Sequence, residues 1–138
     1  MAWHPVGELL QPRALYESLA DRLRERILSH EFQPGEPIDE AALLRDYGIS
    51  RTPVREALKL LHHEGLLTAR PRRGMVVTVL GPSEIQEATR LYRLMQAHAQ
   101  SESEQGRAVG PLHARMLEMA QRHLRLAHGA AFEDRLGV

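Results

Sequence analysis

The sequence predicts a mainly α-helical protein with one small β-hairpin, arranged as a winged helix-turn-helix followed by two or three α-helices. Three observations lead to this prediction. Apolar residues recur at helical spacing in several segments, a glycine separates two consecutive helical segments, and two short strand-like segments enclose a basic turn. The order helix, short helix, glycine turn, longer helix and hairpin is typical of winged helix-turn-helix domains.

The N-terminal end and the first predicted helix differ in their proline and glycine content. Residues 1–13 hold two prolines and a glycine, which favour turns, so we predict a loosely ordered N-terminal arm. From Ala14 to about His30, leucine and isoleucine recur every four residues and predict an amphipathic helix that ends before Pro34-Gly35. Its predicted buried positions are Leu15, Leu19, Leu23 and Ile27.

Two helices joined by a glycine turn are predicted next. The first runs from about Glu40 to Tyr47, with Asp39 placed to cap its free backbone N–H groups. Gly48 can adopt the left-handed conformation that ends a helix. Ser50 offers a hydroxyl to cap the second helix, which runs roughly from Arg51 to Glu64. The predicted buried stripe of this longer helix consists of Val54, Ala57, Leu58 and Leu61.

A β-hairpin is predicted to complete the first domain. Residues 66–69 and 75–80 are the candidate strands, and the stretch 70–74, with its proline and glycine, forms a charged turn between them. Gly81-Pro82 marks the end of this domain. The winged helix-turn-helix therefore occupies residues 14–80.

The C-terminal region, residues 81–138, is predicted to be helical. Its first helix opens with Ser83 and Gln86 as a capping box and runs to about Gln100, where polar residues interrupt it. A second helix is predicted from about Leu112 to Ala127. The apolar positions that predict these helices are Ile85, Ala88, Tyr92, Met95 and Ala99 in the first, and Leu112, Met116, Ala120, Leu124 and Ala127 in the second.

The longer helix of the helix-turn-helix carries cations on the side opposite its apolar stripe. Arg51, Arg55 and Lys59 are spaced four residues apart, so they share one face, and Thr52 lies beside them. An arginine can bind guanine O6 and N7 with two hydrogen bonds, which allows it to recognise sequence. Thr52 and the N-terminal backbone N–H groups of the helix suit a phosphate.

The charge distribution favours a nucleic-acid partner locally. Lys and Arg together equal Asp and Glu over the whole chain. Residues 51–73, however, hold six cations against two acids, a net charge of +4, and the remainder carries −4. Such an asymmetry is typical of a DNA-binding face. A solvated helix face beside a basic loop would show the same charges, and the glycine turn, the serine cap and the hairpin together favour the DNA-binding interpretation.

The central motif resembles the DNA-binding domain of the GntR family. The unbroken run Gly48-Ile49-Ser50-Arg51-Thr52-Pro53-Val54-Arg55-Glu56-Ala57-Leu58 carries the resemblance, together with Pro34-Gly35 and Glu64-Gly65-Leu66. The part from Ser50 to Leu58 is similar to the FadR-type (FCD) branch. The resemblance covers about residues 14–80 and implies an operator-binding dimer, usually a repressor released by a metabolite.

Carried over by position, the resemblance implies two groups of DNA contacts. Arg51, Thr52 and Arg55 would belong to the recognition helix, with Lys59 on the same face. The wing would enter or flank the minor groove through Arg70, Arg72, Arg73 and Gly74. One departure stands out. Some FadR-type proteins carry an arginine early in the short helix, where this sequence has Glu40-Ala41-Ala42, so a contact from that position is absent.

The C-terminal region resembles the family less well. FadR-type proteins carry a longer helical effector domain, often with a metal held by one aspartate and three histidines. Only 58 residues follow Leu80, and no histidine follows Asp134. The region is therefore either a partial effector domain or a short tail for dimerisation, as in the YtrA-like branch. His113, His123 and His128 lack the spacing that directs two imidazoles at one ion. We expect no metal site, no cofactor and no small-molecule switch in this chain by itself, while the identity of any effector metabolite stays open.

Other functional classes are disfavoured by composition. The absence of cysteine excludes disulfides and Cys-ligated metals. No apolar run approaches the length of a membrane span or a signal peptide, so we expect a cytoplasmic protein without membrane association. No phosphate-binding glycine loop or nucleophile-histidine pattern indicates an enzyme. The alternative to a DNA-binding regulator is a winged helix that binds a protein partner, although such a module need not keep both a basic helix and a basic wing.

Overall fold

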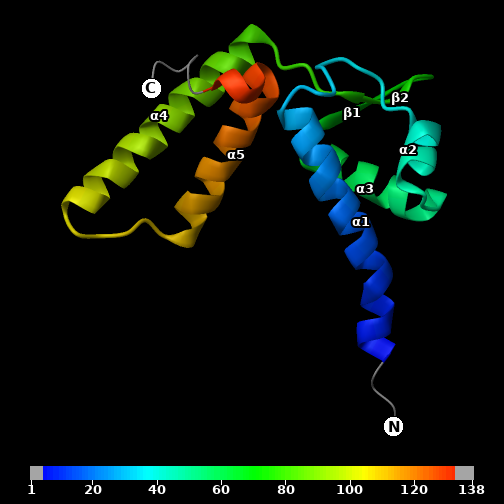
Figure 1. Cartoon of the computed structure of the whole chain (residues 1–138). Helices are drawn as coiled ribbons and strands as arrows, with labels where there is room; N and C mark the ends of the chain where they lie inside the picture. Colours follow the sequence, from blue (N-terminus) through cyan, green and yellow to red (C-terminus); the bar gives the residue numbers. More distant parts are fainter. Residues whose placement is uncertain (1–4, 133–138) are drawn as a thin grey trace. The chain divides into compact units, whose positions relative to one another are not determined.

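The computed structural model describes residues 5–132 and is mostly helical. These residues form five α-helices and one two-stranded antiparallel hairpin, which confirms the predicted fold class (Figure 1). The elements are α1 (Pro5–Leu28), α2 (Glu40–Tyr47), α3 (Arg51–His63), β1 (Leu67–Arg70), β2 (Gly74–Val77), α4 (Pro82–Glu104), α5 (Pro111–His128) and the short 3-10 helix η1 (Gly129–Ala131). They divide into two compact units, residues 5–27 with 31–78 and residues 28–30 with 79–132.

Helix α1 begins earlier than the sequence predicted. Residues 5–13 continue the helix, so the prediction of a loosely ordered arm is wrong for these residues. Pro5, as the first residue of the helix, loses no hydrogen bond there, whereas Pro12 lies inside α1 and leaves one helical carbonyl without its N–H donor. The following segment Glu8-Leu9-Leu10-Gln11 consists of residues with high helix propensity. The first four residues of the predicted arm lie outside the described part of the chain.

The core of the first unit forms where the apolar stripes of its helices meet the hairpin. Three of the four predicted α1 positions are buried, but Leu15 is 47% exposed. In α3, all four predicted apolar positions are buried. The buried residues of this core are Leu19, Ala20, Leu23, Ile27, Leu43, Val54, Ala57, Leu58, Leu61, Leu66, Leu67, Val76 and Val77. The apolar sides of α2 and α3 therefore pack into the core, and their other sides remain available for polar residues.

The turn between α2 and α3 follows the prediction, except for one cap. Asp39 Oδ1 accepts a hydrogen bond from Ala42 N at 3.1 Å, and Gly48 adopts a left-handed φ of 62°. Ser50 occupies the N-cap position of α3, but its hydroxyl makes no capping hydrogen bond. An N-cap side chain normally accepts from the second or third helical residue. The third residue of α3 is Pro53, which has no N–H to donate.

The hairpin gains a third strand-like neighbour from the chain before α2. Leu67 pairs with Val77 and Arg70 with Gly74, so each strand is short and differs by a few residues from its predicted span. On the other side of β2, Ile38 N donates to Met75 O and Val77 N donates to Glu36 O, both at 2.9 Å. Strand β2 is therefore hydrogen-bonded on both sides, to β1 and to the segment before α2.

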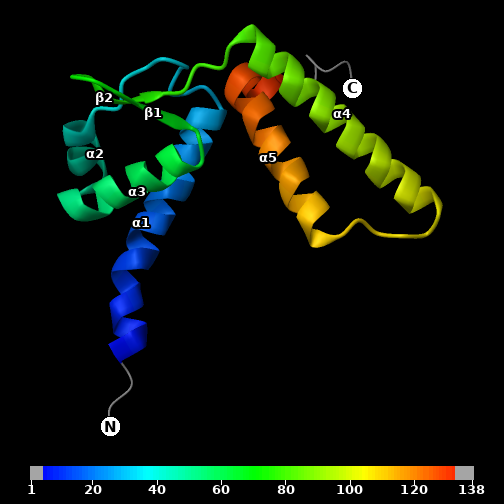
Figure 2. The same cartoon turned by 180° about the vertical axis from the view of Figure 1, so that it is seen from behind.

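The second unit is a helical hairpin of α4 and α5, seen from two sides in Figures 1 and 2. Its small core holds Tyr92, Ala120, Leu124 and Phe132, with Ala88, Met95 and Leu117 packed against it. Three details differ from the prediction. Helix α4 begins at Pro82, where Gly81 N donates to Glu84 Oε1 at 3.3 Å, so the Ser83–Gln86 capping box does not form the start.

The other two differences concern the end of α4 and the apolar face of α5. Helix α4 continues to Glu104, because polar side chains bond along it, as in Gln100 Nε2 to Glu104 Oε1 at 3.1 Å. Leu112 and Met116 are 63% and 49% exposed, although the helical period predicted them on a buried stripe. Two helices bury only one seam between them, so the rest of a broad apolar face stays on the surface. None of the described helices is long and apolar enough to cross a membrane.

Candidate nucleic-acid interface

Helix α3 separates apolar and polar side chains sharply. Val54, Ala57, Leu58 and Leu61 are buried in the core of the first unit. Arg51, Thr52, Arg55 and Lys59 are all exposed. Their spacing along the helix places these four side chains on one outer face, beginning at its N-terminus. We call this group the α3 face.

Two of the cations on the α3 face are paired with acids. Arg55 Nε donates to Glu40 Oε1 at 3.1 Å, and Glu40 is the first residue of α2. Lys59 Nζ donates to Glu56 Oε1 at 3.3 Å, one turn earlier on the same helix. The side chains of Arg55 and Lys59 are 58% and 65% exposed, so both remain available to a ligand. Exposed pairs of this kind contribute little to stability.

A hollow of about 230 Å³ lies between α2 and α3. Arg51 and Arg55 line it from α3, while Glu40, Ala41 and Leu44 line it from α2. We call it the α2–α3 hollow. It places two guanidinium groups beside a carboxylate and a small apolar wall, which is a surface suited to the polar edge and methyl groups of bases.

The hairpin tip carries the second group of predicted residues. Arg70, Arg72, Arg73 and Gly74 are all exposed. Arg73 N donates to Arg70 O at 3.2 Å and closes the turn. Gly74 has a φ of 68°, and Arg72 has a φ of 66°, a left-handed conformation that costs an L-residue about 1–2 kcal/mol. The turn thus presents the side chain of Arg72 on a strained backbone at the exposed tip of the hairpin.

Sequence reasoning assigned no contact to Glu40, and the structure brings it into the site. The sequence showed only that the short helix starts Glu40-Ala41-Ala42, a region where some FadR-type proteins carry an arginine. Its reach to Arg55 depends on the angle between α2 and α3, because the two residues are 15 positions apart. No local spacing rule pairs side chains across such a separation.

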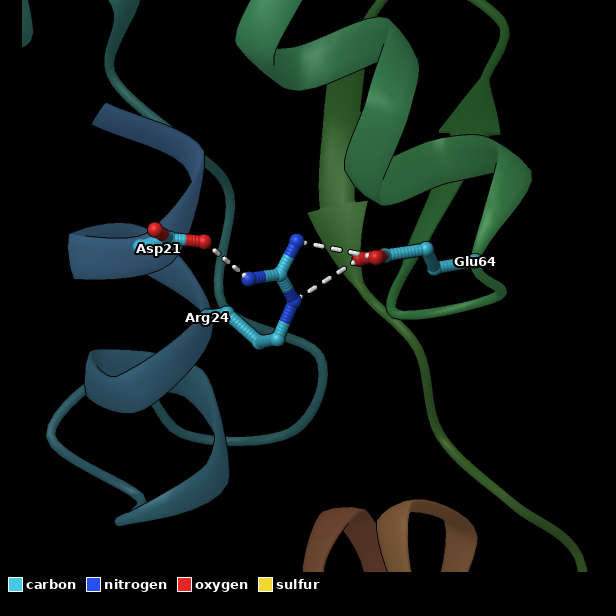
Figure 3. Close-up of polar contacts among 3 residues, drawn as sticks. All are labelled: Asp21, Arg24 and Glu64. Carbon is cyan, nitrogen blue, oxygen red and sulfur yellow. Dashed lines mark hydrogen bonds and ion pairs between the residues drawn. The ribbon is translucent and has the colours of Figure 1, made fainter. Parts of the chain in front are cut away.

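The C-terminal end of α3 is anchored to α1 by a group of three charged residues, drawn in Figure 3. The guanidinium of Arg24 donates to both carboxylate oxygens of Glu64, from Nε at 3.0 Å and from Nη2 at 2.8 Å. Its third nitrogen, Nη1, donates to Asp21 Oδ1 at 2.7 Å. Burial lowers the pKa of Arg24, but the hydrogen bonds to Glu64 and Asp21 outweigh it and raise the pKa above its ordinary value. Arg24 is thus a permanent cation that fixes α3 against α1.

The histidines of the second unit form no convergent metal site within residues 5–132. No group of three or more metal-ligating side chains is found there. His123 Nδ1 lies 2.8 Å from Met119 O on its own helix. The ring of His113 lies beside that of His98, with 5.3 Å between the centroids. Asp134 falls outside the described residues.

Comparison with known proteins agrees with this geometry. Residues 15–77 match the family model of bacterial regulatory proteins, gntR family. They form a GntR-family helix-turn-helix domain. This GntR-family domain holds α2, α3 and the hairpin, and therefore the whole α3 face and the wing.

Relatives of the GntR-family domain are transcription regulators. The HTH-type transcriptional regulator YdhC of Bacillus subtilis is 38% identical over 80 residues, which are 58% of this chain and 36% of YdhC. The mannosyl-D-glycerate transport/metabolism system repressor MngR of Escherichia coli is 41% identical over 56 residues, 40% of this chain and 23% of MngR. The chain thus matches about a third or less of the length of these two relatives.

A solved structure extends the likeness in fold beyond the GntR-family domain. The GntR transcriptional regulator from Rhodococcus sp. RHA1 superimposes with a TM-score of 0.56 over 88% of this chain and 67% of the other. The two sequences are 19% identical, so this likeness concerns the fold alone.

Proposed function

We propose that this protein is a sequence-specific DNA-binding transcription regulator that inserts α3 into the major groove of operator DNA. One observation carries the proposal. The basic face of α3 lies opposite the side chains that the core buries, so it is presented to a partner instead of being used for folding. The match of the GntR-family domain to transcription regulators supports the same function.

The chemistry of the α3 face suggests a division of roles. Arg51 and Arg55 can each bind guanine O6 and N7, which gives sequence recognition. Thr52 and the free N–H groups at the start of α3 suit a phosphate, and Lys59 adds a point charge for the backbone. The wing residues Arg70, Arg72, Arg73 and Gly74 would contact the minor groove or its phosphates, chiefly through charge.

We further propose that the protein acts as a dimer on a two-fold operator, in the cytoplasm where bacterial DNA lies. A single small domain contacts few base pairs, and symmetric dimers bind paired half-sites. Exposed apolar side chains on α4 and α5 could supply the dimer contact, and they are Leu91, Leu94, Leu112, Met116 and Met119. The motif from Ser50 to Leu58 favours the FadR-type branch, and the relative MngR is a repressor, which supports repression here.

Selection from a random DNA pool tests the proposed function directly. The full chain is used to enrich sequences, and affinities for an enriched and a scrambled duplex are then compared at one salt concentration. A specific regulator binds its site about a thousandfold or more above other DNA. Equal affinity for all sequences would contradict the proposal and would favour a winged helix that docks a protein partner.

A further inference from the structure

We propose that Glu40 is a specificity-determining residue, which orients Arg55 toward a base and opposes its contact with phosphates. This inference rests on the proposed DNA-binding function. It begins from the hydrogen bond that joins the two residues, Arg55 Nε to Glu40 Oε1 at 3.1 Å.

The stability of α2 alone does not account for a glutamate at position 40. A carboxylate in the first turn of a helix interacts favourably with the helix dipole. Asp39 already caps this end by accepting from Ala42 N at 3.1 Å. Glu40 instead extends toward α3, and its pair with Arg55 is exposed enough that its contribution to folding is small.

The hydrogen bond to Glu40 leaves the terminal nitrogens of Arg55 available to a ligand. A guanidinium has five N–H donors in a planar fork, and Glu40 engages the one on Nε. Among the described residues, the terminal nitrogens Nη1 and Nη2 of Arg55 make no hydrogen bond. Fixing Nε restricts the plane of the guanidinium while these two donors stay available for guanine O6 and N7. A preorganised arginine loses less conformational entropy when it binds.

The charge of Glu40 adds a penalty for wrong contacts. Glu40 lines the α2–α3 hollow together with both recognition arginines, Arg51 and Arg55. A carboxylate there repels the phosphate backbone and so lowers sequence-independent affinity. Specificity is a difference between two affinities, and a repulsive element against the wrong partner increases it. The carboxylate of Glu40 would therefore reduce total affinity for DNA while increasing selectivity.

The test compares Glu40→Gln with the matched control Asp46→Asn in the full chain. Both substitutions remove one negative charge from α2, and Asp46 is exposed and lines a different pocket, with Phe32 and Ile38. Affinities for the selected operator and for a scrambled duplex are measured at one salt concentration. For Glu40→Gln we expect operator affinity to fall and scrambled affinity to rise. Their ratio should fall about three- to tenfold, because the amide oxygen of Gln still accepts from Arg55 but without the charge. The control should leave the ratio unchanged.

A second variant separates positioning from general structure. In an Arg55→Ala background, Glu40→Gln should leave the ratio of operator to scrambled affinity unchanged, because the side chain that Glu40 orients is gone. If the wild type selects an operator and Glu40→Gln keeps the wild-type ratio, or matches the control, the inference is wrong while the proposed function stands. If the wild type selects no sequence at all, the proposed function itself fails. Equal melting temperatures of the variants exclude a folding defect as the cause.

Discussion

Arg24 on α1 holds Glu64 at the end of α3 through two parallel hydrogen bonds, 3.0 and 2.8 Å long, across 40 residues of sequence. Both side chains are largely buried, with 17% and 19% of their surface exposed. The pair fixes the end of α3 that points away from its basic N-terminus. The direction of the α3 face is thus set by an ion pair as well as by the apolar core.

Loss of Arg24 should destabilise the first unit. Arg24→Met leaves the mostly buried carboxylate of Glu64 without its guanidinium, which should lower the free energy of unfolding by about 2 kcal/mol. Asp21→Asn is the control, because Asp21 is 75% exposed and its loss should cost no more than about 0.5 kcal/mol. Urea unfolding measures the free energy of unfolding of both variants and of the wild type. Equal effects of the two substitutions would show that the Arg24–Glu64 pair contributes no more than a surface contact.

Arg51 and Arg55 should each contribute to base recognition. Arg55→Ala should weaken operator binding by about 1–3 kcal/mol and relax the preference at one base pair, and Arg51→Ala should behave similarly. Binding to the selected operator and to single-base variants of it, at fixed salt, checks this. A loss of equal size on operator and scrambled DNA would mean that the residue contacts phosphate and not a base.

A substitution of Arg72 should affect stability and DNA binding in opposite directions. Arg72→Gly relieves the left-handed φ of 66°, so the stability should be kept or raised by up to about 1 kcal/mol. The same change should lower affinity for all DNA and reduce the slope of log affinity against log salt by about one. Removing Arg72 and Arg73 together should reduce the slope by about two.

Arg73→Gly is the matched control for the wing, because Arg73 lies outside the left-handed region. It removes the same charge, but glycine there costs about 0.5–1 kcal/mol of stability. Salt titrations and thermal unfolding of the variants give both quantities. Unchanged salt slopes would place the hairpin tip away from DNA.

The groove between α4 and α5 should be a dimer contact. It has a volume of about 310 Å³, and Leu91, Met95, Met116 and Met119 supply its apolar lining. Met119→Glu puts a charge into this surface and should yield a monomer with much weaker operator binding. Gln86→Glu adds the same charge at an exposed polar position of α4 and should leave the mass unchanged. Sedimentation gives the mass of the wild type and of the two variants. If Met119→Glu is still a dimer, the dimer contact lies elsewhere.

The loop between α4 and α5 should respond to acid through Glu102. Arg107 donates to both of its oxygens at 2.8 and 2.9 Å, which lowers the pKa of Glu102 below its ordinary 4.5, and nearby His98 lowers it further against the opposing effect of burial. Because the folded-state pKa is lowered, this pair stabilises the fold above about pH 4.5, and its contribution disappears as the pH falls through the lowered value. In a carboxylate NMR titration, Arg107→Gln should return the pKa of Glu102 toward 4.5, and His98→Gln should raise it less. No change in Arg107→Gln would refute the pairing in solution.

The order of the helices and strands and the charged side of α3 followed from sequence patterns alone. Helical periodicity placed Val54, Ala57, Leu58 and Leu61 inward, and the structure buries all four. Asp39 and Gly48 marked the ends of α2 correctly, because caps and left-handed glycines follow from chemistry local to a few residues. The same rule misjudged Ser50, since a neighbouring proline removes the N–H that its hydroxyl would accept.

Contacts between residues far apart in the sequence became visible in the folded chain alone. The pairs Arg24–Glu64 and Glu40–Arg55 depend on how helices cross, and periodicity gives a face of a helix without its partner. The exposure of Leu15, Leu112 and Met116 has the same origin, because an apolar stripe predicts burial only where another element covers it. Local order follows from the backbone and from neighbours a few residues away, while burial and pairing follow from packing across the fold.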